Sequence, residues 1–590
     1  MKKPIAALIL CSLAAATAVA QTPTRSPVGV SWLDAKTVLV SDHTAGAAYL
    51  VDAAAGKVAR EVKLNGKPFG VAGNFVAEME AGTIAELDAA GKVKRRLNVG
   101  PRPAGLALAG QKLIVAEAGL EQMLVVDLAA GTVVAKLAAP GLPHAVVAND
   151  KLAAAVGRIP SGDARKADHA AVVTLADPAK PEAAVATVKL PPGSGNVTGM
   201  TLSPDGKWLY IVHTIAHFTL PTTQSERGWI MTAGLTIVDL AERKLYATVL
   251  PDQVSRGAAD PWGIAVSPDG ANAWITLAGA HELARVDLAK THALVARLTP
   301  EKRGELSYDL AAMHTAGAIS RLPLPGGGPR GVAVSPEGGT VAVALYFSGQ
   351  LALVDTKTSA IRAIGLGAQA GETPARKGER LFHDGRLSFQ NWLSCASCHP
   401  DARADGFNWD LLNDGIGNPK NSRSLLWSDR TPPMMSLGVR EDMEHAVAAG
   451  FKFILFRAAE TGEVDAVIAY LKELKPAPSP CLAAGKLSAK AQKGKAVFNK
   501  AGCAACHPAP LYTDKKIYDA GTTHELDRDA KAFDTPTCIE LWRTAPYLHD
   551  GSAPTLREVF KEQNPKDQHG STSKLSDDDL DALIEYLLSL

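Results

Sequence analysis

The chain has 590 residues, of which 46% are apolar and 5% aromatic, and its formal net charge is +1. This length exceeds one typical domain, and the 52 glycines and 37 prolines indicate many turns, so we expect a globular protein of two or three domains and not a disordered chain. A charge so close to zero gives no electrostatic basis for binding nucleic acid or an anionic membrane surface.

The first twenty residues have the features of an export signal. Lys2 and Lys3 precede a mostly apolar run from Ile5 to Val19, and a small-x-small cleavage site follows at 18–20. The apolar run is too short to cross a bilayer, and no later stretch is long and apolar enough to do so. The sequence therefore predicts a signal peptide over 1–20 and a periplasmic or otherwise exported protein with no membrane span.

Residues 28–367 contain a repeated pattern. Clear copies start at Gly263 ("GIAVSPDG") and Gly331 ("GVAVSPEG"), and each runs strand, tight turn, strand, loop, strand, turn, strand. Weaker copies bring the count to seven, which predicts an all-β seven-bladed propeller. The repeats resemble YVTN-type and other quinoprotein-like propellers, a resemblance that specifies the fold more than the function.

An aspartate ends the third strand of most repeats. Because it recurs in unit after unit, we expect it to cap the following turn and not to take part in catalysis. The five positions are Asp52, Asp127, Asp239, Asp287 and Asp355.

Two stretched intervals, 213–235 and 299–328, indicate inserted loops. We expect these loops to touch the C-terminal part of the chain. His213, His217 and His314 lie in them, and each is either close to a haem or an ordinary polar loop residue.

After Gly367 the pattern changes from strands to helices, and two segments match each other. Each begins with a basic helix that leads into a Cys-x-x-Cys-His motif, and each closes with an amphipathic helix, at 464–474 and at 580–590. Ser576 before three aspartates is a start signal for the last helix. The sequence thus predicts two mainly α modules of cytochrome c type, at 372–475 and 482–590, joined by a proline-rich link.

Cys-x-x-Cys-His is the attachment pattern of a c-type haem. The two thiols add to the haem vinyl groups, and the following histidine becomes the proximal iron ligand. A zinc site would need two more cysteines or histidines nearby, and a thioredoxin-like motif would need a βαβ context, which is absent. We therefore predict two covalent haems, on Cys395, Cys398 and His399 and on Cys503, Cys506 and His507.

Two cysteines outside the motifs remain after signal cleavage, Cys481 and Cys538. In an oxidising compartment they either pair as a disulfide or stay as buried thiols, and the sequence leaves both readings open.

The stretch "TPTCIELWRTAPYLHDGSAPTLREVF" (535–560) resembles the C-terminal signature of bacterial di-haem cytochrome c peroxidases and MauG-type enzymes, and "GNPKNSRSLLW" (417–427) resembles a weaker family segment. The resemblance covers about 372–590. It implies a peroxidatic first haem, a second haem that takes electrons from a small redox protein of cytochrome c or cupredoxin type, and a protein or small-molecule substrate. It also implies a calcium ion between the haems, with matching positions at Asn421, Thr544 and Pro546.

The chain departs from this family at the ligand positions opposite the proximal histidines. Where the family has a methionine for the second haem, this chain has Gln563, and we predict that His569 takes its place; the other reading is a solvent-exposed loop histidine. At the first haem, Asn413 stands where related peroxidases place a removable histidine.

Several residues compete for roles at the first haem. Glu444 and His445 fall where the family has a distal acid, and either has the chemistry to move a peroxide proton, but a surface pair on a helix is the other reading. Met434 and Met435 are alternative iron caps, which would favour electron transfer. Trp427 and Trp542 are weak matches for a tryptophan between the haems.

These observations favour an exported di-haem oxidoreductase of peroxidase or MauG type. Electrons would pass from haem two to a reactive haem one, and the propeller would serve as a docking domain or a cover. A non-catalytic electron carrier remains an alternative. A propeller-based oxidase with the haems as its electron outlet is another, although the repeats contain no recognisable quinone or metal site.

Overall fold

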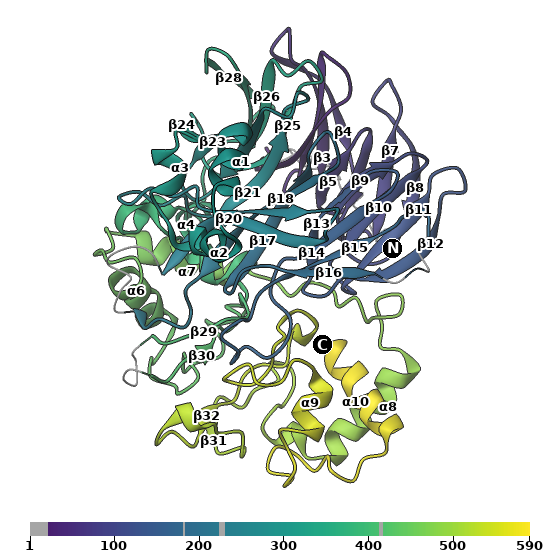
Figure 1. Cartoon of the computed structure of the whole chain (residues 1–590). Coiled ribbons are helices and arrows are strands. Elements are labelled where there is room, and N and C mark those ends of the chain that lie inside the picture. Colours follow the sequence, from purple (N-terminus) through teal and green to yellow (C-terminus); the bar gives the residue numbers. More distant parts are fainter. Residues whose placement is uncertain (1–21, 181–182, 184, 223–229, 412–416) are drawn as a thin grey trace, which may run out of the picture.

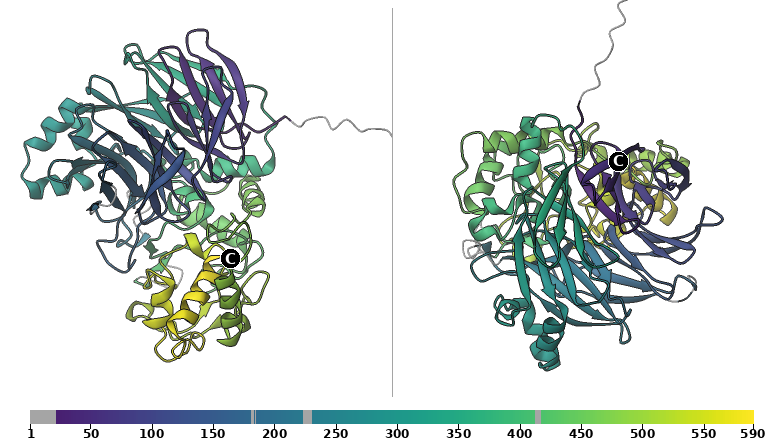
Figure 2. Two further views of the ribbon diagram at one scale, coloured as in Figure 1. Left: turned by 90° about the vertical axis from the view of Figure 1, so that its right-hand side faces the viewer. Right: turned by 90° about the horizontal axis from the view of Figure 1, so that it is seen from above.

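The computed structural model describes residues 22–180, 183, 185–222, 230–411 and 417–590. The predicted signal peptide (1–20) and Asn413 lie outside these ranges. A β-propeller forms one body of the molecule, and two helical modules lie against it on one side (Figures 1 and 2). No helix among the described residues is long and apolar enough to cross a membrane.

The described residues form seven four-stranded antiparallel sheets, so the predicted seven-bladed propeller is confirmed. Within each blade the strands are neighbours in chain order, as expected for strands joined by tight turns. The blades comprise β1 (Pro27–Trp32), β2 (Thr37–Asp42), β3 (Ala47–Asp52), β4 (Lys57–Lys63); β5 (Pro68–Ala72), β6 (Phe75–Glu78), β7 (Thr83–Leu87), β8 (Val93–Asn98); β9 (Pro103–Ala109), β10 (Lys112–Glu117), β11 (Gln122–Asp127), β12 (Thr132–Ala138); β13 (Pro143–Ala148), β14 (Ala153–Gly157), β15 (Val172–Ala176), β16 (Ala186–Lys189); β17 (Ser194–Leu202), β18 (Trp208–Ala216), β19 (Met231–Asp239), β20 (Lys244–Val249); β21 (Pro261–Val266), β22 (Asn272–Leu277), β23 (Glu282–Asp287), β24 (Ile319–Pro323); and β25 (Pro329–Val334), β26 (Thr340–Leu345), β27 (Gln350–Asp355), β28 (Ile361–Gly365).

The innermost strands approach one another so closely that six of the seven carry a glycine at the contact. A Cβ on Gly70 would lie 2.2 Å from the backbone oxygen of Ala104 in the next blade, and one on Gly331 would lie 2.4 Å from that of Val28. The second contact joins blade seven to blade one and closes the ring. The other four are Gly29, Gly105, Gly199 and Gly263.

The recurrent third-strand aspartates cap turns, as predicted. Asp52 accepts a hydrogen bond from the backbone N–H of Ala55 at 2.8 Å, and Asp127 accepts one from Ala130 at 2.8 Å. Asp287 instead caps the helix α1 (Leu288–Ala296) by accepting from the N–H of Lys290. Asp239 and Asp355 bind their own turns in the same way.

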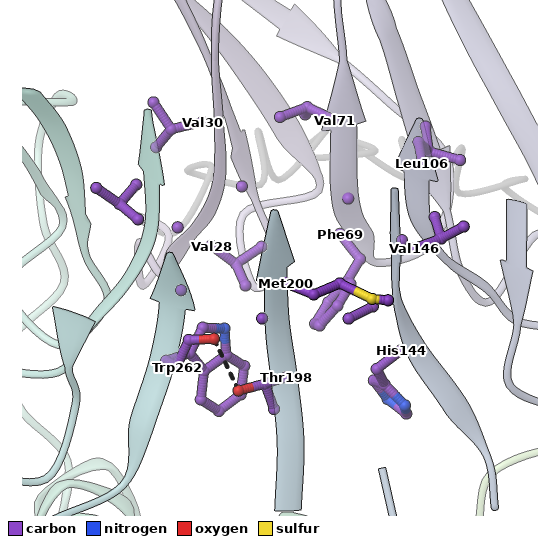
Figure 3. A pocket seen from close by; sticks show the side chains of 18 of the residues that line it. Val28, Val30, Phe69, Val71, Leu106, His144, Val146, Thr198, Met200 and Trp262 are labelled. Carbon is purple, nitrogen blue, oxygen red and sulfur yellow. Dashed lines mark hydrogen bonds between the residues drawn. The ribbon is translucent and has the colours of Figure 1, made fainter. Parts of the chain in front are cut away.

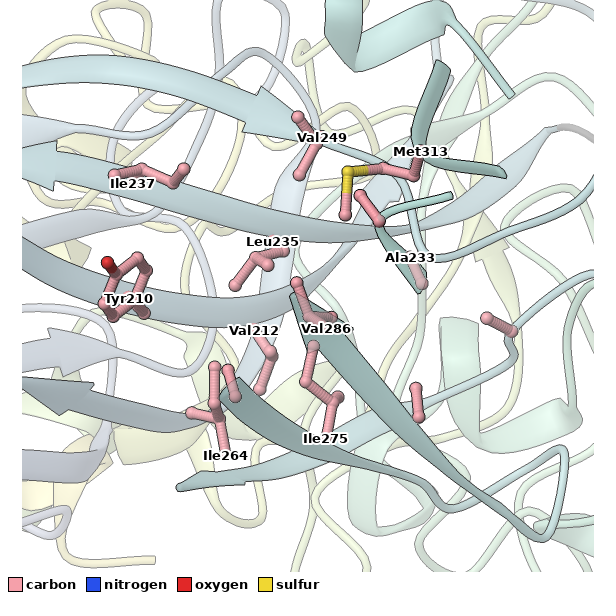
Figure 4. Close-up of a cluster of buried hydrophobic side chains, with 14 of the residues drawn as sticks. Tyr210, Val212, Ala233, Leu235, Ile237, Val249, Ile264, Ile275, Val286 and Met313 are labelled. Carbon is pink, nitrogen blue, oxygen red and sulfur yellow. The ribbon is translucent and has the colours of Figure 1, made fainter. Parts of the chain in front are cut away.

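The chain after blade six's third strand is mostly helical. The helix α1 stands where the repeat predicts a turn and a fourth strand, and the predicted loop 299–328 contains further helices. The whole segment contains α1, α2 (Pro300–Glu305), a 3₁₀ turn η2 (Leu306–Tyr308) and α3 (Ala312–Thr315), and ends in β24. Leu306 and Met313 join the largest buried cluster, between blades five and six (Figure 4). Much of this segment therefore covers the propeller itself, while Gly328 at its end borders a small cavity together with His383 and Ala396 of the first module.

The other stretched interval, 213–235, does reach the first helical module. Strands β18 and β19 run nine residues each, so His213 lies in a strand and is fully buried, not in a loop as expected. Beyond β18, the ring of Phe218 stacks on that of Phe407 with centroids 5.1 Å apart. Apolar packing here continues into the core of the first module.

The two helical modules repeat one arrangement. In each, a first helix carries a glycine where the last helix crosses it: a Cβ on Gly378 would lie 1.8 Å from the Ala466 oxygen, and one on Gly494 would lie 1.8 Å from the Ala582 oxygen. The predicted helix start at Ser576 is confirmed, since its side chain accepts from the N–H of Asp579. The elements are α4 (Pro374–Phe382), η3 (Gly385–Leu387), η4 (Phe389–Asn391), α5 (Cys395–Cys398), η5 (Pro400–Ala402), β29 (Asn408–Trp409), β30 (Lys420–Asn421), α6 (Met443–Phe453) and α7 (Glu463–Glu473), then α8 (Ala489–Lys500), η6 (Cys503–Ala505), β31 (Ile517–Tyr518), η7 (Glu525–Asp527), β32 (Phe533–Asp534), η8 (Leu541–Arg543), α9 (Leu556–Lys561) and α10 (Asp577–Leu588).

We expect Gly70→Ala to destabilise the propeller by about 1–3 kcal/mol, because the new Cβ meets rigid backbone of the next blade. Thermal unfolding followed by circular dichroism measures the change. Gly339→Ala is the matched control, because its Cβ would meet nothing within 4 Å. Equal melting temperatures for the two variants would contradict this account of the ring.

Candidate functional site

The first Cys-x-x-Cys-His motif is fixed to the propeller through two serines. Ser394 and Ser397 cap the short helix α5 reciprocally, and both hydroxyls donate hydrogen bonds of 2.6 Å to the carboxylate of Asp260. Asp260 immediately precedes β21 and is 7% exposed. Burial raises the pKa of Asp260, although the two serine hydrogen bonds oppose that shift. A propeller residue thus sets the position of the first cysteine pair.

His399 follows α5, and its ring is oriented by a hydrogen bond to the backbone. Its Nδ1–H donates to the backbone oxygen of Arg403 at 2.9 Å, which fixes the tautomer and leaves Nε2 as the electron-pair donor. Burial lowers the pKa of His399, so the ring is held neutral. A neutral imidazole oriented through Nδ1 is suited to bind an iron through Nε2.

The second motif repeats this geometry. Cys503 lies in η6, and the Nδ1–H of His507 donates to the backbone oxygen of Tyr512 at 3.0 Å. The same Nδ1 lies 3.2 Å from the sulfur of Cys538, a buried residue. The four motif cysteines are free and half-buried, as needed for thioether attachment. Cys481 and Cys538 are also free, so the disulfide reading is not supported.

His569 faces His507 across the second module. The two ring centroids are 6.4 Å apart, and the rings are inclined by 47°. Two imidazoles that bind one metal from opposite sides, with about 2 Å between each nitrogen and the metal, have ring centres roughly 6 Å apart. Burial lowers the pKa of His569 to about 4, and its buried Nδ1 has no hydrogen-bond partner among the described residues.

A network of side-chain hydrogen bonds holds the His569 loop in place. The buried Asn564 accepts from the His569 N–H at 2.8 Å and donates to backbone oxygens of His569 and Gly570. The N–H of Ser571 donates to the oxygen of Ala501, at the end of α8 and just before the motif. The loop that carries His569 is therefore tied to the segment that carries the cysteines.

The surroundings of the first motif are apolar and carry a methionine. Cys395, Cys398 and Met434 pack against one buried cluster, which includes Met443 and Phe451. The Met443 sulfur accepts from the Ser428 hydroxyl at 3.1 Å. No ring contact of His399 with another aromatic or histidine ring occurs among the described residues, unlike His507.

Glu444 and His445 lie in the first turn of α6 and are exposed. The Nδ1 of His445 is 2.8 Å from Asp442, and this hydrogen bond and charge raise the pKa of His445. The structure brings neither residue into contact with the first motif. Their catalytic role stays a prediction, and helix capping by Asp442 accounts for the local arrangement.

The residues matched to a calcium site gather only in part. The N–H of Asn421 donates to the backbone oxygen of His549 at 2.7 Å, and a Cβ on Gly551 would lie 2.7 Å from the Asn421 amide nitrogen and 3.2 Å from Pro546. Thr544 directly follows η8 and lies two residues before Pro546 in the sequence. Within the described ranges, no three His, Cys, Asp or Glu side chains cluster as they would around a metal.

A buried ion pair joins the two modules. The Arg403 guanidinium contacts both carboxylate oxygens of Glu540, at 2.5 and 3.1 Å, and Glu540 is fully buried. Burial opposes the charge of Glu540, but the hydrogen bond from Arg403 holds its pKa below the ordinary value. Because the Arg403 carbonyl also accepts from His399, one residue contacts both the first proximal histidine and the second module.

Asp401 joins all three parts of the chain. Its carboxylate forms ion pairs with Arg158 of the propeller at 2.5 Å and with Arg543 of the second module at 3.3 Å. Although burial opposes its ionisation, the charges of Arg158 and Arg543 hold the pKa of Asp401 well below its ordinary value. The carboxylate therefore remains charged between two guanidiniums.

The remaining candidates from sequence lie away from the motifs. The Nε2 atom of His213 forms a hydrogen bond of 2.7 Å with the Thr236 hydroxyl. The ring of His217 contacts that of Tyr308, and the ring of His314 is hydrogen-bonded to the Gln253 side chain. Trp542 packs between Arg102 and Arg543 and touches propeller residues, while Trp427 lies under Arg430. The structure gives none of them a contact with a motif residue.

Sequence reasoning missed Asp260, Arg403 and Glu540. Each pairs with a residue more than 130 positions away, as with the separation of 137 between Arg403 and Glu540. No local spacing could indicate such pairs. Only the paired serines around the first cysteine, absent from the second motif, hint that this motif has an additional partner.

Comparison with known proteins identifies both helical modules. Residues 373–473 match the family model described as di-haem cytochrome c peroxidase, and residues 491–590 match that of cytochrome c. Cytochrome c domains imply covalently bound haem c. The predicted resemblance to the di-haem cytochrome c peroxidase and MauG class is confirmed, and this class indicates a peroxidase-like oxidoreductase.

Two relatives and one solved structure extend this result. The chain is 29% identical to hydrazine synthase subunit gamma of Kuenenia stuttgartiensis over 271 residues, which cover 36% of this chain and 77% of that protein. It is 29% identical to the methylamine utilization protein MauG of Methylophilus methylotrophus over 273 residues, covering 36% and 82%. A structure of Kuenenia stuttgartiensis hydrazine synthase superposes with a TM-score of 0.52 at 24% identity over 58% of this chain and 99% of that chain, which shows likeness of fold.

The contact between Asp384 and His281 makes the joint of propeller and first module sensitive to acid. Asp384 lies 3.2 Å from His281 of the propeller and 2.7 Å from Arg386. Burial would raise the pKa of Asp384, but hydrogen bonds from Arg386 and His281 hold it well below the ordinary value of 3.8. A carboxylate with a depressed pKa stabilises the fold above pH 3.8, and this contribution is lost as the pH falls below that value.

We expect Asp384→Asn to lower stability by about 1–3 kcal/mol at pH 7, and the difference from wild type to shrink as the pH falls below 3.8. Melting temperatures measured from pH 7 to pH 3 test this. Glu242→Gln, at an exposed position, is the control and should follow wild type throughout. A difference that grows toward acid pH would contradict the assignment.

Proposed function

We propose that this protein is an exported di-haem oxidoreductase of peroxidase or MauG type. Electrons enter at the second module and are used at the first, where a peroxide or related oxidant is reduced. Haem supplies the redox chemistry, and the chain supplies the attachment, the axial histidines and the position of one module against the other. The Cys395/Cys398 and Cys503/Cys506 pairs would hold the two groups.

The observation that carries this proposal is the difference between the two proximal histidines. His507 faces a second imidazole, His569, at a separation suited to one metal, whereas His399 faces no ring among the described residues. Two strong axial ligands favour electron transfer, and an open or weakly bound position favours reaction with an oxidant. His507 and His569 would therefore serve the relay, and His399 the reactive side.

Contacts between the modules support a relay between them. From His399 the connection runs through the Arg403 carbonyl and guanidinium to Glu540. Two residues before Glu540, the Cys538 sulfur touches His507 at 3.2 Å. This continuous path of buried contacts holds the two proximal histidines in a fixed relation, which efficient transfer requires.

Several features of the proposed function rest on the class and not on this geometry. The donor would be a small cytochrome c or cupredoxin, and a calcium ion at Asn421, Thr544 and Pro546 would brace the modules. Glu444 or His445 would deliver a proton only if the substrate enters beside α6. The name of the relative from hydrazine synthase adds small nitrogen compounds to the substrates to be tested.

The propeller would serve chiefly as a cover on the first module. The end of the propeller that faces this module contacts α5 through Asp260 and the loop after α5 through the Arg158–Asp401 pair. A docking partner would therefore use the blade edges or the opposite face.

A second candidate function, non-catalytic electron transfer, is favoured by Met434. This thioether packs against the same buried cluster as Cys395 and Cys398, and methionine sulfur is a common second ligand in electron-transfer cytochromes. The two functions differ in whether an oxidant reacts at the first module.

We expect His569→Ala to convert one low-spin haem to high spin, because His507 would keep no imidazole opposite it. Electron paramagnetic resonance of the oxidised protein measures this, and mass spectrometry should show both haems still attached. His524→Ala, in the same module, is the control. An unchanged spectrum for His569→Ala would remove His569 from the ligand set.

The function itself is tested by mixing the fully reduced protein with hydrogen peroxide and, separately, with hydroxylamine. We expect peroxide to reoxidise both haems, and His569→Ala to slow the oxidation of haem two relative to haem one. Stopped-flow absorption follows each haem. Two low-spin haems with no response to either compound would favour the electron carrier.

A further inference from the structure

A small cavity lies between the mouth of the propeller channel and the first module. Its volume is about 20 Å³, which is close to the volume that a cavity needs to hold one water molecule. Trp262 borders this cavity and also the larger cavity of about 170 Å³ in the propeller channel (Figure 3). The two cavities therefore lie on either side of Trp262. The other polar walls of the small cavity are Arg158, Asn196, Asp260, Arg330, His383 and Asp401.

Arg330 is the unusual member of this wall. It is 8% exposed, and its guanidinium lies 3.4 Å from the ring centroid of Tyr346 and 4.3 Å from that of Trp262. Across the described parts of the chain, no hydrogen bond or ion pair reaches this guanidinium. The aromatic faces compensate part of its charge, but five N–H donors in a buried place call for an acceptor.

The carboxylates near Arg330 favour its charge, but each already has other partners. Glu379 acts on Arg330 electrostatically, yet it is paired with Arg376 at 2.6 Å and accepts from the Tyr346 hydroxyl. Asp401 is shared by Arg158 and Arg543, so two guanidiniums already use one carboxylate. Asp260 accepts from Ser394 and Ser397, which occupy one of its oxygens each. Burial lowers the pKa of His383 to about 4 and so keeps it neutral. Each nearby carboxylate is thus engaged elsewhere, and the Arg330 guanidinium has no direct acceptor among the described residues.

We propose that this cavity binds a halide-sized inorganic anion on the guanidinium of Arg330. The site exists only where the propeller and the first module meet, because its walls come from both. A negative charge there lies beside the 396–401 segment that carries His399. Binding of the anion would thus change the electrostatic environment of His399, the first proximal histidine.

Bromide is the probe for the first experiment, because its anomalous scattering identifies it directly. Crystals of the full holoprotein grown in sodium bromide should show an anomalous peak within hydrogen-bond distance of Arg330, and those of Arg330→Met should not. A wild-type map with a well-ordered Arg330 and water or no density in the cavity would overturn the proposal. A peak belonging to a haem carboxylate would overturn it too.

Chloride-dependent stability gives the solution test. We expect the melting temperature of wild-type protein to rise and saturate with sodium chloride relative to sodium gluconate at equal ionic strength. Arg330→Met should lose this rise, and Arg285→Met, an exposed arginine over Trp274, should keep it. If Arg330→Met does not fold, Arg330→Lys replaces it and should weaken the response. The same rise in the Arg330 and Arg285 variants would contradict a specific site.

Discussion

The position of the first haem-attachment helix depends on one buried carboxylate. Asp260 receives both serine hydroxyls of the capping box around Cys395, so the helix that holds the cysteines is oriented by a residue of the propeller. Leaving a buried carboxylate without these donors would cost several kcal/mol, so the pairing strongly favours one docked arrangement. The Arg158–Asp401 pair and the stacking of Phe218 on Phe407 then follow on the same face.

Two modules with one fold have acquired different surroundings. Both use the same glycine-mediated helix crossing and the same Nδ1-to-carbonyl bond at the proximal histidine. The first module is enclosed by the propeller, while the second supplies its own opposite histidine from a loop held by Asn564. The proposed division into a relay and a reactive haem rests on this difference in environment within a common frame.

The sequence predicts what is encoded locally. Repeated turns and strand lengths led to seven blades, and motif spacing led to the two cysteine pairs and their histidines. The absence of the family methionine leads to His569, whose ring centroid lies 6.4 Å from that of His507. By contrast, α1 stands where the repeat predicts a turn and a fourth strand, and α2 and α3 stand where an inserted loop is predicted. Their apolar residues pack on blades that only the ring brings near. Asp260 binds Ser394, and Glu540 binds Arg403. Each pair is separated by more than 130 residues in the sequence, so no local pattern reveals it.

The propeller ring closes without exchanging a strand between its first and last blades. Its seam is held by the approach of Gly331 to Val28 and by Arg25, which binds the backbone oxygen of Ala368 and the side chain of Gln369 just before the first module begins. Ala368 and Gln369, in the segment that leaves the ring, therefore also hold Arg25 in the segment that enters it. During synthesis, the first blade has no partner on one side until the last blade emerges, so the ring and its fastening are completed late, as the haem modules follow.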